Sequence, residues 1–102
     1  MLKGVTMTKE YILDFLNTHR TELYERYGLV KVGLFGSYAK GNASEESDID
    51  LYAEFENRKF KNIASAWNYF EEQFGKKIDL FYAHKNMRES LKKSIESEVI
   101  YG

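Results

Sequence analysis

The segment 48–55 constrains the fold more than any other part of this chain, because polar and apolar residues alternate along it. In a β-strand, residues two positions apart project to the same face, so Asp48 and Asp50 point together. The opposite face is wholly apolar and consists of Ile49, Leu51, Ala53 and Phe55. Neighbouring carboxylates repel each other unless a cation lies between them. Oxygen ligands of this kind suit Mg²⁺, which binds through one or two carboxylates plus substrate phosphates.

A Gly-Ser turn comes before this strand in the chain. An apolar strand at 29–35 ends at Gly36 and Ser37, and a polar loop at 40–47 then leads to Asp48. Gly36 allows the backbone to approach a ligand closely, and the Ser37 hydroxyl and nearby N–H groups can donate to phosphate oxygens. The Lys40 ammonium in this loop could pair with a triphosphate. A phosphate cradle beside a pair of carboxylates predicts a site for a nucleoside triphosphate and Mg²⁺.

A third strand is predicted at 77–82, with Ile78, Leu80 and Tyr82 on one face and Asp79 on the other, beside Phe81. An aspartate among apolar strand residues is costly if it is buried without a partner. Two interpretations of Asp79 stay open at this point. It is either a further acidic residue of the same site or an edge-strand residue that faces water.

Helical periodicity accounts for the rest of the chain. One helix is predicted from Thr8, as its cap, to a C-terminal glycine at Gly28, and a second over 59–74, stopped by Gly75. A last helix begins at a capping box formed by Asn86 and Glu89. The second helix carries an apolar stripe expected in the core: Phe60, Ile63, Trp67, Phe70 and Phe74. The order α-β-β-α-β-α predicts a small α/β (α+β) fold, with a mixed sheet and helices on the apolar face of the 48–55 strand.

Composition narrows the class of protein. A length of 102 residues predicts a single domain over 1–102. The net charge of −1 argues against general nucleic-acid binding, which normally needs a basic surface. The absence of cysteine suits a reducing cytoplasm, and no apolar run approaches the length of a membrane span. The expected protein is cytoplasmic, with no membrane contact.

Two motifs carry a family resemblance. Gly36-Ser37, ten further residues and then Asp48-Ile49-Asp50 resemble the signature of the polymerase-beta-like nucleotidyltransferase superfamily. The run 34–41, LFGSYAKG, is similar to the minimal nucleotidyltransferase (MNT) branch of that superfamily, which includes antitoxins paired with HEPN-domain toxins. The resemblance covers nearly the whole chain, because the acidic strand at 77–82 also matches.

The resemblance implies a nucleotidyltransferase fold and an enzyme that transfers AMP from ATP to a hydroxyl group of a partner protein. Asp48, Asp50 and Asp79 would be the catalytic residues and would hold two Mg²⁺ ions, about 3.5–4 Å apart. The Gly36-Ser37 turn and Lys40 would bind the nucleotide. The expected partner is a HEPN-family toxin, modified at a tyrosine, and this chain would be its antitoxin.

The turn departs from the family pattern, which commonly reads Gly-Ser-Arg-x-Arg-Gly. Tyr38 supplies no charge, and Lys40 keeps a charge without the bidentate geometry of arginine. These departures bear on substrate affinity. Two other functions stay open: a catalytically weak binding module that neutralises a helical partner by complex formation, and an oligomeric nucleotidyltransferase that acts on a small molecule.

Overall fold

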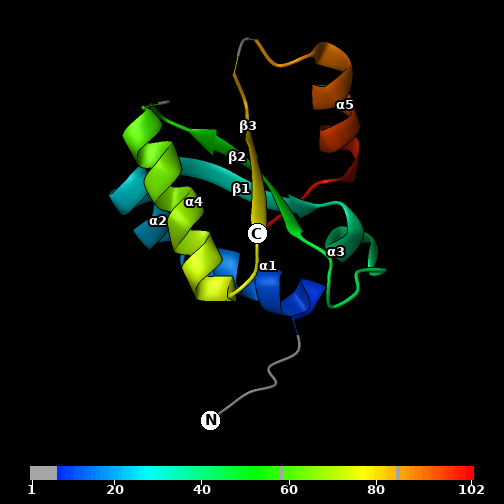
Figure 1. Ribbon diagram of the computed structural model, residues 1–102. Coiled ribbons are helices and arrows are strands. Elements are labelled where there is room, and N and C mark those ends of the chain that lie inside the picture. The colour runs from blue at the N-terminus through cyan, green and yellow to red at the C-terminus, as the bar shows by residue number, and fades with distance from the viewer. Residues whose placement is uncertain (1–6, 58, 85) are drawn as a thin grey trace.

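The computed structural model describes residues 7–57, 59–84 and 86–102, and these form a mixed sheet with flanking helices (Figure 1). The strands, in the spatial order β3-β2-β1-β4, are β1 (Leu29–Phe35), β2 (Ile49–Phe55), β3 (Ile78–Tyr82) and β4 (Ile100–Tyr101). The helices are α1 (Lys9–Thr18), α2 (Arg20–Tyr27), α3 (Ser37–Lys40), α4 (Phe60–Phe74) and α5 (Glu89–Glu98). This architecture confirms the predicted fold class.

The central strand β2 fixes the topology of the sheet. It pairs antiparallel with β1 and parallel with β3, and α4 supplies the crossover that a parallel pair requires. Strand β4 pairs antiparallel with β1. The sequence analysis did not predict β4, because two residues are too few to show an alternating pattern.

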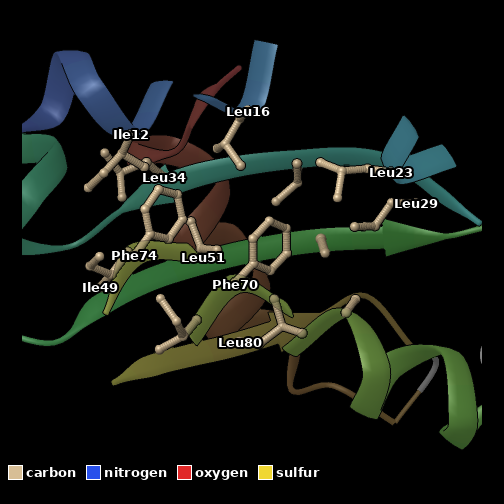
Figure 2. Packing of buried hydrophobic residues seen from close by; sticks show 14 of the residues in the cluster. Ile12, Leu16, Leu23, Leu29, Leu34, Ile49, Leu51, Phe70, Phe74 and Leu80 are labelled. Atoms are coloured by element: carbon tan, nitrogen blue, oxygen red, sulfur yellow. The ribbon is translucent and has the colours of Figure 1, made fainter. Parts of the chain in front are cut away.

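The core lies on the apolar face of β2, as predicted, and Figure 2 shows how it packs. Ile12 and Leu16 of α1 cover this face beside Leu51, and Phe70 and Phe74 of α4 pack against the same cluster. Burying an aliphatic or aromatic side chain of this size contributes about 1.5–3 kcal/mol. Because these helices cover one face of β2, the face that carries Asp50 is left for α5 and for the site (Figure 1).

The predicted helix over 8–27 is two helices, and the break is at His19. Thr8 caps α1 as predicted, since its hydroxyl accepts a hydrogen bond from the Tyr11 N–H. The His19 ring lies 4.0 Å from the Phe15 ring, and its Nδ1 is 2.9 Å from the Phe15 carbonyl oxygen. The His19 backbone has φ −99° and ψ 14°, outside the range of a regular α-helix. Gly28 ends α2 with φ 73°, also as predicted.

Two other expectations were wrong. Phe60 is the first residue of α4 and 82% exposed, so it does not belong to the core stripe. The predicted capping box at Asn86 and Glu89 is absent: α5 begins after Arg88, and no side chain of a described residue caps it. Ile95 is the one residue of α5 that is buried, so this helix packs little of its surface against the sheet. No helix within the described ranges has the length and apolarity needed to cross a bilayer.

Candidate active site

The Gly36-Ser37 turn lies against the Asp50 carboxyl group. Gly36 follows β1 with φ 78° and ψ −152°, a conformation that essentially only glycine adopts. A Cβ at this position would collide with Oδ2 of Asp50. The backbone therefore approaches the carboxylate as closely as it does only because residue 36 has no side chain. The sequence analysis expected Gly36 to approach a ligand closely; the structure shows a close approach to Asp50.

The residues after the turn form the short helix α3. Tyr38 and Ala39 are buried in the core, whereas Lys40 is exposed. Tyr38 therefore has a packing role, which accounts for an aromatic residue where the family pattern has arginine. The Lys40 ammonium lies 3.6 Å from Oε2 of Glu98 on α5. The sequence analysis did not anticipate this ion pair, because residues 40 and 98 are far apart in the chain.

Two of the predicted carboxylates face each other across the parallel strands. Asp50 pairs with Asp79 in the β2–β3 register, and both are half-buried. Burial, the charge of Asp79, a hydrogen bond with Asp79 and the charge of Asp48 raise the pKa of Asp50 from 3.8 to about 6. Asp79 therefore has Asp50 as its neighbour, and it is neither fully buried nor fully exposed. The pair carries an electrostatic cost that a bound cation would relieve.

The third carboxylate, Asp48, is directed to a lysine. Its Oδ2 is 4.0 Å from Nζ of Lys77, the residue just before β3. Accordingly, no group of three Asp, Glu, His or Cys side chains in the described ranges is arranged to hold a metal ion. The Asp50–Asp79 pair does supply hard oxygen ligands of the kind that Mg²⁺ prefers. The structure therefore brings Asp50 and Asp79 together and keeps Asp48 beside them in a separate ion pair.

The rest of the site face is closed by the C-terminal elements. Tyr52 follows Asp50 by two residues and is fully buried, and its hydroxyl has no hydrogen-bond partner among the described residues. Burial, with the nearby charge of Glu96, raises the pKa of Tyr52. A Cβ on Gly33 would collide with Val99 and Tyr101, so β4 packs tightly there. The Asp50 end of this face is the part that stays partly exposed.

A second lysine holds the loop between α3 and β2. The Lys76 ammonium donates to the Glu45 carbonyl oxygen at 2.7 Å and lies 6.0 Å from the centre of the Tyr38 ring. Lys77 and Glu98 are the charged neighbours that the sequence analysis missed. Lys77 could have been found, because it precedes Asp79 by two residues and therefore shares its face.

Sequence comparison places this chain in a known family. Residues 16–101 match the nucleotidyltransferase domain family. Protein adenylyltransferase MntA of Thermococcus cleftensis is 33% identical over 96 residues, which cover 93% of this chain and 96% of that protein. A protein of Methanocaldococcus jannaschii that is also named as a protein adenylyltransferase is 35% identical over 97 residues, covering 92% and 97% of the two chains.

Solved structures give the same answer. A structure described as a minimal nucleotidyltransferase superposes with a TM-score of 0.77 at 30% identity, over 95% of this chain and 98% of the other. A toxin–antitoxin solved with AMP-PNP has a TM-score of 0.66 at 17% identity, over 82% and 69%, and shares the fold. The chain therefore belongs to the nucleotidyltransferase domain family as a minimal member, and it is a nucleotidyltransferase.

Proposed function

We propose that this chain is a Mg²⁺-dependent protein adenylyltransferase that transfers AMP from ATP to a tyrosine hydroxyl of a HEPN toxin and thereby acts as its antitoxin. The observation that carries the proposal is the Asp50–Asp79 pair, placed across β2 and β3 beside a glycine turn. The relatives named protein adenylyltransferase support the transfer of AMP to protein. A toxin–antitoxin of the same fold solved with AMP-PNP supports ATP and a toxin partner.

The nucleotide would lie over the turn and the carboxylates. Gly36 and Ser37 would seat the β- and γ-phosphates, and Lys40 would contribute a positive charge at the exposed end of α3. In the structure, the Lys40 ammonium forms an ion pair with Glu98 of α5. Asp48, Asp50 and Asp79 would hold Mg²⁺, which when bound offsets the charge of the triphosphate and polarises the α-phosphate.

The reaction is an in-line displacement. The tyrosine oxygen bonds to the α-phosphorus, the bond from that phosphorus to the α–β bridging oxygen breaks, and pyrophosphate leaves. Asp79 would accept the hydroxyl proton, because its carboxylate lies beside Asp50 across β2 and β3. The products are an AMP–tyrosine ester and pyrophosphate. Positioning and charge stabilisation would supply most of the rate enhancement.

The proposal can be tested with purified proteins. ATP labelled at the α-phosphate is incubated with Mg²⁺, the chain and a purified HEPN toxin, and the label on each protein is measured. The wild type is expected to label the toxin, and Asp50→Asn is expected to lose at least about 100-fold of this rate, because it removes a charged ligand. Glu46→Gln is the matched control, since Glu46 is an exposed carboxylate in the loop that precedes β2.

Two results would contradict the proposal, each in favour of another function. A stable complex with an unlabelled toxin would indicate the binding module. ATP turnover with a small hydroxyl compound and no effect of the toxin would indicate a small-molecule nucleotidyltransferase.

A further inference from the structure

Lys77 occupies a place in the site that matches the place of Asp79. In the parallel register, Ile49 pairs with Ile78 and Asp50 pairs with Asp79. The Ile49 N–H also donates to the Lys77 carbonyl oxygen at 3.1 Å, so the pairing of the two segments already includes Lys77, the residue before β3. Alternate residues share a face. Lys77 therefore lies opposite Asp48 as Asp79 lies opposite Asp50, and an ammonium group is part of the carboxylate-bearing face.

The contact between Lys77 and Asp48 is loose. Their nearest charged atoms are 4.0 Å apart, and the two side chains are 70% and 41% exposed. Exposed ion pairs of this kind contribute little to stability and are weakened by salt. The lysine side chain is long and flexible, so its ammonium can change partner without disturbing the fold.

Two other lysines near the site contact groups other than the three aspartates. Lys40 pairs with Glu98 on α5, and Lys76 donates to the backbone of the loop at Glu45. Within the described ranges, the ion pair of Lys77 is the one that involves Asp48, Asp50 or Asp79. A triphosphate that enters beside these acidic residues needs positive charge at this point.

We infer that Lys77 is a nucleotide ligand: its ammonium leaves Asp48 when ATP binds and contacts the β- or γ-phosphate, while Asp48 becomes free to bind Mg²⁺. This inference rests on the proposed function, because it places the triphosphate over Asp48 and the Gly36-Ser37 turn. It assigns to Lys77 the phosphate-binding charge that Tyr38 does not supply. Such a contact exists equally in the bound substrate and in the transition state, so it acts on KM more than on kcat.

Direct nucleotide binding tests this role without any chemical step. The affinity of AMP-PNP is measured by calorimetry with Mg²⁺ for the wild type, Lys77→Ala and Lys77→Arg. Lys77→Ala should weaken binding by about 10-fold or more, since hydrogen bonds to charged groups are the strong ones. Lys77→Arg keeps the charge and should stay within about 3-fold of the wild type. Lys61→Ala, an exposed lysine of α4, is the matched control.

AMP serves as the second probe, because it has no β- or γ-phosphate. The affinity for AMP should be the same in the wild type and in Lys77→Ala. Wild-type affinity of Lys77→Ala for AMP-PNP would overturn the inference and leave the proposed function intact. An equal loss for AMP and AMP-PNP would overturn it too, since the lysine would then act through the local structure. A wild type that binds no AMP-PNP would contradict the proposed function itself and this inference with it.

Discussion

Asp50 lies between two groups that leave it little freedom: the Gly36 backbone on one side and the Asp79 carboxyl on the other. The contact with Gly36 requires a residue without a Cβ. Burial, together with the neighbouring Asp79 and the charge of Asp48, raises the pKa of Asp50 to about 6. The site is therefore held in an electrostatically unfavourable arrangement by its backbone. The unusual Gly36 backbone and the repulsion between the two carboxylates have measurable consequences for stability, for pH dependence and for tolerance of substitution.

The first prediction concerns stability. The folded-state pKa of Asp50 is raised from 3.8 to about 6, so between these pH values the folded protein binds the proton that the unfolded chain has lost. Stability should therefore fall as pH rises through this window and stay lower above it. Asp50→Asn should remove the effect and stabilise the protein at pH 7.5 by on the order of 1 kcal/mol, a figure reduced for solvent screening.

Urea unfolding of the wild type and Asp50→Asn at pH 4 and pH 7.5 measures this. The difference between the variants should be present at pH 7.5 and small at pH 4. A variant that is less stable than the wild type at pH 7.5 would contradict the electrostatic account of the pair.

The second prediction concerns the pH dependence of activity. Because the ionised form of Asp50 is the one that binds a cation, kcat/KM should rise with pH through about 6 at low Mg²⁺. Raising the Mg²⁺ concentration should move this transition to lower pH, because metal and proton compete for the same carboxylate. Initial rates across pH 5–8 at two Mg²⁺ concentrations test the prediction. A midpoint that does not respond to Mg²⁺ would exclude Asp50 as the titrating ligand.

The third prediction separates the backbone strain of an alanine at positive φ from the collision of its Cβ with Asp50. Gly36→Ala should abolish activity and destabilise the protein by about 1–3 kcal/mol or more, because ψ −152° at positive φ strains any other residue and the new Cβ would meet Asp50. Gly75 also has a positive φ, 64°, but a Cβ added there would meet nothing within 4 Å, so Gly75→Ala is the control. It should cost about 1 kcal/mol and leave activity unchanged. Equal activities of the two variants would argue against the close approach at Gly36.

The fourth prediction concerns Tyr52, whose buried hydroxyl has no partner among the described residues. Removing an unsatisfied buried polar group is neutral or stabilising by about 1 kcal/mol. Tyr52→Phe should therefore keep or raise the unfolding free energy, measured in urea. A loss of more than about 1 kcal/mol would mean that the hydroxyl has a partner in solution.

The fifth prediction tests the core through two phenylalanines of α4. Phe70 is fully buried and Phe60 is 82% exposed. Phe70→Ala should destabilise the protein by about 3–5 kcal/mol, whereas Phe60→Ala should change stability by less than about 0.5 kcal/mol. Thermal or urea unfolding of both variants distinguishes them. Comparable losses would mean that α4 packs in another orientation.

Much of the fold could be predicted from local pattern. The alternation at 48–55 and the glycines at 28 and 75 gave strands and helix ends that agree with β2, α2 and α4. What local pattern could not predict depends on partners distant in sequence. Phe60 is an example: it follows the apolar periodicity of α4 and is still 82% exposed, because periodicity does not show whether another element covers the first turn of a helix. The break at His19 is not visible in the apolar periodicity either.

The candidate site divides in the same way. The motif placed Asp50 and Gly36 in one site, and the structure brings these two residues together. The position of Lys77 on the face of Asp79 could have been predicted, but its ion pair with Asp48 follows from strand register, and the ion pair of Glu98 with Lys40 follows from the position of α5. Register between β2 and β3 is set by the fold, so a single sequence shows which residues share a face but not which residues face each other.

The most direct test of the proposed activity is the intact mass of a toxin partner, encoded by a neighbouring gene and co-expressed with this chain. With the wild type, the toxin should carry AMP-sized additions, and with Asp48→Asn/Asp50→Asn it should carry none. Peptide mapping should then place the additions on tyrosine. An unmodified toxin that co-purifies equally with both forms would contradict the account and show that this chain acts by binding alone.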